Sequence, residues 1–208
     1  MATGSGGHGT EDVLGALAAG RDLEGGSGHA HGPTADLSVR PAVPEDAPLI
    51  TDLQLAAWRA RGLLDADQLA MVDTDAVRDQ WSAAITNPPS QRHRVLTACA
   101  GADVVGFLAF APAEHTELPE SAGAQPVEVI ALEVSAARTR EGHGARLLAA
   151  CADLAGEAGA TSMSTWAGTD DEARTRFLDS AGFAPAGQRR SLASPSGNVV
   201  EHLWFALI

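Results

Sequence analysis

The pattern of hydrophobic and polar positions after residue 36 predicts alternating strands and helices. Short apolar runs rich in β-branched residues predict strands, at 37–41, 94–100, 104–110, 127–134, 161–166, 187–192 and 199–207. Apolar residues at helical spacing predict helices, at 44–61, at 65–86 with a break near 73–74, at about 144–159 and at 170–180. The order β-α-α-β-β-β-α-β-α-β-β predicts an α/β (α+β) fold, with a mixed sheet that carries helices on both faces.

The first 36 residues have a different character. They are rich in glycine, and only 11–23 has an apolar face that could form a helix. Such a segment cannot bury enough surface to order itself. Its histidines lack the regular spacing of a metal site, and we expect no metal. We therefore predict a flexible tail at 1–36 and one domain at 37–208.

The run at 127–134 contains two carboxylates, Glu128 and Glu133. Its other residues are mostly apolar, as is typical of a central strand buried on both sides. An unpaired buried carboxylate is costly, and such a strand needs neither charge for packing. Both glutamates are therefore candidates for chemistry. They have opposite parity on an ideal strand, although a bulge could bring both to one side.

The segment between this strand and the next helix reads Arg138-Thr139-Arg140-Glu141-Gly142-His143-Gly144. The first amides of a helix have no intrahelical partner and favour anions. Glycines there let a phosphate approach the amides, and the arginines add positive charge. The turn therefore suits a pyrophosphate. An ordinary strand-to-helix turn is the alternative. A dinucleotide-binding turn is disfavoured because Leu147 stands where its third glycine would be.

These residues also carry a resemblance to a known family. The stretch VSAARTREGHGARLL is similar to the acyl-CoA signature of the GNAT N-acetyltransferases, (Gln/Arg)-x-x-Gly-x-(Gly/Ala), with Thr139 in the Gln/Arg position. A second stretch, DDEARTRFLDSAGF, resembles the family's Asn-x-x-Ala-x-x-Phe-Tyr-x-x-x-Gly-Phe block. There Gly182 and Phe183 match, an acid (Asp170 or Asp171) stands near the Asn, and Leu178 replaces the Tyr.

The resemblance covers about 37–208 and implies the mostly antiparallel GNAT sheet. It also implies acetyl-CoA as co-substrate, with pantetheine beside an opened strand and the pyrophosphate on the turn. The residues that would bind it are Leu132, Val134, Arg138, Thr139, Arg140, Glu141, Gly142, His143, Gly144 and Ala145.

The resemblance also bears on catalysis. Glu128 stands fourteen residues before Gly142, where histone-acetylating members carry their general base. Partial burial raises the pKa of a carboxylate towards neutrality, as a base requires. We therefore favour Glu128 over Glu133 and expect Glu133 to pair with an arginine. The family's usual general acid is a tyrosine, and this chain contains none.

Composition and charge limit the kinds of binding partner that this protein can have. The net charge is −13, and all 14 basic residues are arginine. So acidic a chain is a poor candidate for nucleic-acid binding. No apolar run approaches the roughly 20 residues of a membrane span. Cys99 and Cys151 fall in expected core positions, as is typical of free thiols in a reducing cytoplasm. The sequence is compatible with a homodimer but does not determine the oligomeric state.

Together these features predict a cytoplasmic, acetyl-CoA-dependent N-acetyltransferase. The acetyl group would pass directly to a primary amine of a small molecule or a protein in a ternary complex. The alternative is a non-catalytic acyl-CoA-binding module that serves as a sensor or binds a partner. The missing tyrosine favours this alternative, and Glu128 argues against it.

The assignment of 1–36 as a tail predicts that it is dispensable for folding. A chain that starts at Leu37 should melt within about 2 °C of the full chain, since a segment without apolar periodicity adds no core. Differential scanning calorimetry of the two chains checks this. A loss of several degrees, or failure to fold, would show that 1–36 contributes to the domain.

Overall fold

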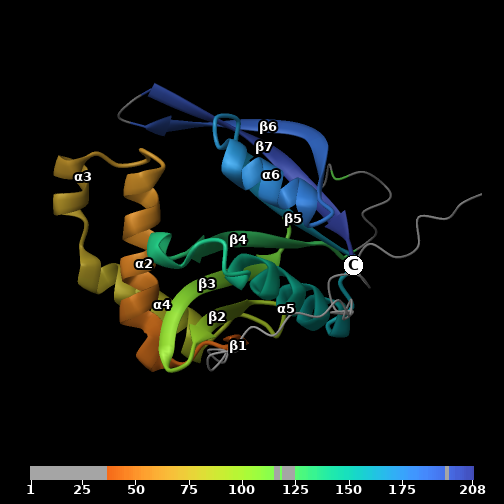
Figure 1. The fold of residues 1–208 in the computed structure, drawn as a ribbon, viewed down its shortest axis with the longest axis horizontal. Helices are drawn as coiled ribbons and strands as arrows, with labels where there is room; N and C mark the ends of the chain where they lie inside the picture. The colour runs from red at the N-terminus through yellow and green to blue at the C-terminus, as the bar shows by residue number, and fades with distance from the viewer. Residues whose placement is uncertain (1–36, 115–117, 119–124, 195–196) are drawn as a thin grey trace, which may run out of the picture. The chain divides into compact units, whose positions relative to one another are not determined.

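The computed structural model describes residues 37–114, 118, 125–194 and 197–208 (Figure 1). The predicted tail at 1–36 and most of the loop predicted at 111–124 lie outside the described residues. All the described residues belong to one unit of the chain, His31–Ile208.

The described residues form a seven-stranded sheet in the order β1-β2-β3-β4-β5-β7-β6. The pair β4 and β5 is parallel, and the other pairs are antiparallel. The strands are β1 (Leu37–Pro41), β2 (Arg94–Ala100), β3 (Asp103–Pro112), β4 (Val127–Val134), β5 (Ser162–Gly168), β6 (Ala184–Ser194) and β7 (Gly197–Leu207). The predicted element order and the mixed, mostly antiparallel sheet are confirmed.

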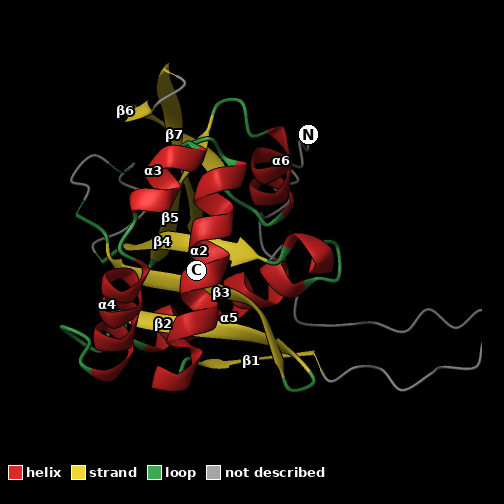
Figure 2. Cartoon of the chain, turned by 90° about the vertical axis from the view of Figure 1, so that its left-hand side faces the viewer, coloured by secondary structure: helices red, strands yellow, loops and turns green. Residues whose placement is uncertain are grey.

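Helices cover both faces of the sheet (Figure 2). Those of the first half are η1 (Pro44–Asp46), α2 (Ala47–Ala60), α3 (Ala66–Met71) and α4 (Thr74–Thr86); those of the second are η3 (Ala136–Arg138), α5 (His143–Glu157) and α6 (Glu172–Ser180). The predicted break near 73–74 is confirmed. It arises because the Asp73 side chain accepts a hydrogen bond from the Ala76 amide (3.0 Å) and begins a new helix.

Two apolar cores lie on opposite faces of the sheet. The larger is built by Leu147 and Cys151 of α5 and Leu178 of α6 against the strands. The smaller sets Ile50 of α2 against Phe107 of β3. Cys99 and Cys151 are buried free thiols, as predicted. No described helix is long and apolar enough to cross a membrane.

The strand β4 departs from the prediction of a strand buried on both sides, because Ile130 is 59% exposed. Its register with β3 shows the cause. Ala109 pairs with Ala131 and Phe110 pairs with Val129, so Ile130 is an extra residue without a direct partner. Such a β-bulge turns one side chain out of the alternating pattern.

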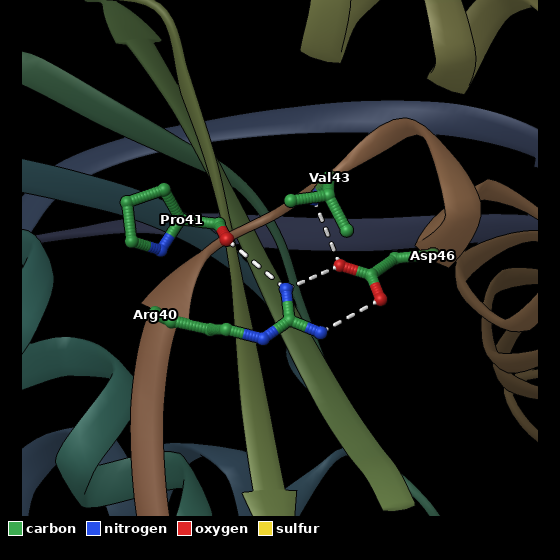
Figure 3. Close-up of polar contacts among 4 residues, drawn as sticks. All are labelled: Arg40, Pro41, Val43 and Asp46. Atoms are coloured by element: carbon green, nitrogen blue, oxygen red, sulfur yellow. Dashed lines mark hydrogen bonds and ion pairs between the residues drawn. The ribbon is translucent and has the colours of Figure 1, made fainter. Parts of the chain in front are cut away.

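An ion pair fixes the turn between β1 and α2 (Figure 3). Arg40 donates two hydrogen bonds to the Asp46 carboxylate, at 2.6 and 2.9 Å, and the Val43 amide donates a third at 2.9 Å. Asp46 is buried. Burial alone would raise the pKa of Asp46, but the Arg40 guanidinium and the Val43 amide together hold it below its ordinary value.

Asp46→Asn should therefore destabilise the domain at neutral pH, by about 1–3 kcal/mol, because Arg40 loses its carboxylate partner. Since the pKa of Asp46 is lowered on folding, its contribution is complete above its unfolded pKa of about 4. It is lost as the pH falls through the lower folded pKa. Denaturant unfolding at several pH values measures both effects.

The exposed pair of Arg78 and Asp75 (2.9 Å) provides the control, and Asp75→Asn should cost less than about 1 kcal/mol. A cost for Asp46→Asn no larger than that of the control, or one independent of pH, would contradict the assignment.

Candidate functional site

The strands β4 and β5 separate soon after they meet. They pair at only two positions, Val127 with Met163 and Glu128 with Ser164. Beyond these the Thr165 hydroxyl donates to the Val129 carbonyl oxygen (3.0 Å), and an arginine of α6 reaches the carbonyl oxygen of Leu132. Main-chain groups of β4 near Leu132 therefore face an opening between the two strands, as the sequence analysis expects.

The bulge at Ile130 brings Glu128 and Glu133 to the same face of the sheet. Glu128 lies opposite Ala111, and Glu133 lies opposite Phe107, which belongs to the smaller core. Ala111 and Phe107 are an even number of residues apart on β3, so both point to the face covered by α2 and α4. The two glutamates nevertheless lie at different depths, roughly 15 Å apart along the strand.

Glu133 lies beyond the point where β4 and β5 separate, and it makes an ion pair. Its Oε1 lies 2.7 Å from Nη2 of Arg61, the residue that ends α2, and its side chain is 13% exposed. Burial raises the pKa of Glu133, and the nearby charges of Arg61 and Arg174 oppose that rise without cancelling it. The expected pairing of Glu133 with an arginine is thus present.

Glu128 is half-buried and lies where β4 still pairs with β5, opposite Ser164. Within the described residues, Glu128 also interacts with another group and is not free. Its position is at the closed end of the opening, whereas Glu133 lies on the side where the strands are apart.

The predicted anion-binding turn leads into α5. The Arg146 amide makes the first i→i−4 hydrogen bond of the helix, to the Gly142 carbonyl oxygen (3.1 Å). The amides before it are the ones that a helix leaves without an intrahelical acceptor. Gly142 has φ = +80° and Arg140 has φ = +67°, a left-handed conformation that a non-glycine residue seldom adopts. The turn is therefore a specialised backbone conformation.

Side chains at this turn partly neutralise one another. The Glu141 carboxylate lies 3.6 Å from Nε of Arg138 and 3.3 Å from Nε2 of His143. The His143 side chain is 1% exposed, so only its main chain can face an external anion. Arg140 is exposed and keeps its side chain at the surface.

The two glycines have different roles. Gly142 is required by its positive φ. Gly144 lies against α6, because a Cβ there would be 3.2 Å from the ring of Phe177. The second glycine therefore lets α5 and α6 approach, which the sequence analysis did not anticipate.

A cavity of about 620 Å³ lies beside the end of β5. It lies between the end of α2, the end of β5 with the turn after it, the start of α6, and the β6–β7 hairpin. Its charged lining includes Arg61, Asp171, Arg174 and Glu201. The volume is in the range of small-molecule sites, which run from about 300 to 1,000 Å³.

One wall of the cavity combines an aromatic ring with an ion pair. The Arg190 guanidinium lies 4.4 Å from the centroid of the Trp166 ring. The same guanidinium binds the buried Glu201 carboxylate at 2.7 Å. A cation held over an aromatic face and paired with a carboxylate gives this wall a fixed geometry.

The sequence of 53–183 matches the family model described as the acetyltransferase (GNAT) family. That match covers more than half of the chain. The chain belongs to the GNAT acetyltransferase family.

Solved structures with the same fold include other acetyltransferases. The ribosomal-protein-alanine N-acetyltransferase of Brucella melitensis is 18% identical, with 82% of this chain and 99% of that one covered and a TM-score of 0.64. YncA of Salmonella typhimurium, solved with its cofactor acetyl-CoA, is 20% identical, with 82% and 93% covered and a TM-score of 0.62. At such identities the likeness concerns the fold. A search of curated proteins found no significant match.

The PaiA N-acetyltransferase of Thermoplasma acidophilum, solved in complex with coenzyme A, also shares the fold. It is 12% identical, with 83% of this chain and 99% of that one covered and a TM-score of 0.61. The GNAT fold, which the sequence analysis proposed from two short motifs, is thus confirmed by a family match and by structures.

Sequence reasoning missed several residues that line the cavity, among them Arg61, Trp166, Arg174 and Glu201. One of them left a signal. Arg174 stands one helical turn before Leu178, which is fully buried, so a charge lies on the inward face of a predicted helix. Such a charge is costly without a partner, so it is a reason to consider the residue as a site candidate. The others depend on contacts between distant segments.

The Arg61–Glu133 pair predicts that Arg61→Met raises the pKa of Glu133 further, since the arginine favours the charged carboxylate. Carboxyl carbon NMR across a pH titration measures this pKa. Arg59→Met, an exposed change on the same helical turn, should leave it unchanged. Equal pKa values in wild type and Arg61→Met would show that the ion pair does not form in solution.

Proposed function

We propose that this GNAT protein is an acetyl-CoA-dependent N-acetyltransferase that acetylates a primary amine. The observation that supports it best is the opening between β4 and β5. Main-chain groups of β4 border it, and the predicted anion-binding turn follows β4 in the chain. Arg174, which contacts β4 at Leu132, also lines a cavity of small-molecule size.

The acyl donor would bind along β4. The pantetheine arm carries amides that can pair with main-chain groups of Leu132 and Val134, much as an added strand would. The pyrophosphate would lie on the amides of the turn Arg138–Ala145 (Thr139, Arg140, Glu141, Gly142, His143 and Gly144 between them), where the start of α5 favours negative charge. Exposed Arg140 supplies a full positive charge there.

The acceptor amine would enter from the cavity. Three carboxylates, Asp170, Asp171 and Glu201, line it together with the two arginines Arg61 and Arg174. Acidic groups favour a cationic ammonium over a neutral or anionic acceptor. A cavity of about 620 Å³ accommodates a small molecule or the end of a peptide chain.

Transfer would proceed by direct attack. The carboxylate base first takes one proton from the ammonium. The neutral amine nitrogen then forms a bond to the acyl carbon, the carbon–sulfur bond breaks with its electron pair on sulfur, and the second nitrogen proton passes to water. Glu133 is the better placed base, because it lies where the strands are apart and burial raises its pKa. Glu128, which the sequence favours, is the alternative.

A non-catalytic acyl-CoA-binding module is the second candidate. The resemblance puts the family's usual tyrosine at Leu178, which is fully buried in the larger core. An assay of thiol release from acetyl-CoA over a panel of amines separates the two. Amine-dependent release supports the transferase, and CoA binding without release supports the module.

Glu133→Gln should lower kcat at neutral pH by about 10²–10⁴-fold, the usual range for a general base, with CoA affinity unchanged. Because the pKa of Glu133 is raised, wild-type kcat/KM should rise with pH through that value. The deficit of the variant should shrink at high pH, where the amine arrives deprotonated. Steady-state kinetics and calorimetry measure both.

Glu128→Gln is the matched comparison on the same strand and face. If it reproduces the loss and Glu133→Gln does not, Glu128 is the base. If both variants keep full activity, neither carboxylate removes the proton and solvent does so instead.

A further inference from the structure

Arg174 of α6 spans the opening between the strands. Its Nη1 donates a hydrogen bond to the carbonyl oxygen of Leu132 (3.2 Å), in the part of β4 that β5 no longer pairs with. Arg174 also lines the cavity beyond. It is therefore the side chain between the proposed place of the acyl donor and the proposed place of the acceptor.

The surroundings of Arg174 combine charge and burial. Burial and the nearby charge of Arg61 lower the pKa of Arg174. The negative charges of Glu133, Asp171 and Glu201 oppose this lowering. A guanidinium keeps its charge in such a site. Its Nε is buried and has no hydrogen-bond partner within the described residues. A buried donor without an acceptor is unfavourable, and in a cleft it indicates a place for a ligand atom that accepts.

We propose that Arg174 is a catalytic residue that stabilises the thiolate leaving group of the acyl donor; this rests on the proposed transferase function. The acyl oxygen can accept hydrogen bonds from main-chain N–H groups of β4, which leaves sulfur as the atom that needs a cationic partner. The chain contains no tyrosine that could protonate it.

The acyl transfer does not require a proton from Arg174. The acceptor nitrogen, after losing one proton to the carboxylate base, supplies the electron pair of the new carbon–nitrogen bond and gives its second proton to water. When the carbon–sulfur bond breaks, its electron pair stays on sulfur. Arg174 only donates a hydrogen bond to this thiolate, which leaves as an anion or takes a proton from water. A guanidinium suits this role because it stays protonated.

A purely structural role is the alternative, in which Arg174 joins α6 to β4. The affinity of CoA relative to desulfo-CoA, measured by calorimetry between pH 7 and pH 10, distinguishes the two without any acceptor. If Arg174 faces the sulfur, bound CoA prefers the thiolate. Its advantage over desulfo-CoA should then grow with pH by about tenfold, as expected for a thiol pKa lowered by about one unit.

In Arg174→Gln this growth with pH should disappear, while desulfo-CoA affinity stays within about twofold, and kcat should fall by about 10²–10³-fold. Arg174→Lys keeps a positive charge and should retain part of the growth. Arg176→Gln is the matched control, since Arg176 lies on the same helix with a side chain 77% exposed and pairs with Glu172 at the surface. It should behave as wild type.

Three results would overturn the assignment. They are a wild-type CoA advantage that does not change with pH, an advantage in Arg174→Gln that still grows, and a loss of desulfo-CoA affinity as large as that of CoA. The first needs no variant, so it decides the matter even if Arg174→Gln fails to fold. If CoA shows the pH-linked advantage but no amine is acetylated, the proposed transferase function fails and the contact of Arg174 with sulfur stands.

Discussion

The separation of β4 and β5 is the constraint on which the rest of this structure depends. Two parallel strands that pair at two positions leave main-chain groups without ladder partners, and buried main-chain groups need partners. Here side chains supply some of these partners. The Thr165 hydroxyl donates a hydrogen bond to the carbonyl oxygen of Val129, and Arg174 donates one to that of Leu132. The two strands therefore do not continue as a regular ladder beyond Glu128 and Ser164.

The bulge at Ile130 has a similar effect on the chemistry. Without it, Glu128 and Glu133 would face opposite sides of the sheet, and only one could approach an acceptor. With it, both lie on the side of α2, and Glu133 meets Arg61 at the end of that helix. The bulge also leaves Ile130 exposed and interrupts the hydrogen-bond ladder between β3 and β4. Burial raises the pKa of Glu133 and the arginine limits that rise, which supports the base role that we propose for this carboxylate.

Local signals in the sequence were enough for most of the fold. Proline, glycine and β-branched residues marked the strands and turns, and Asp73 marked the start of α4. The exposure of Ile130 was not predictable, because a bulge depends on the register with Ala109 and Phe110 of β3. The arginine partner of Glu133 was expected, but its identity was not, since Arg61 lies 72 residues away and the chain has 14 arginines. Contacts of this kind follow from the tertiary fold alone.

A crystal structure of the protein with CoA tests the central claim most directly. We expect the pantetheine arm to lie between β4 and β5, with hydrogen bonds to main-chain groups of Leu132 and Val134. The pyrophosphate should accept hydrogen bonds from the amides of Gly142 to Ala145, and the sulfur should lie beside Arg174. A CoA molecule bound elsewhere, or an opening that closes into a continuous β4–β5 ladder, would contradict the account.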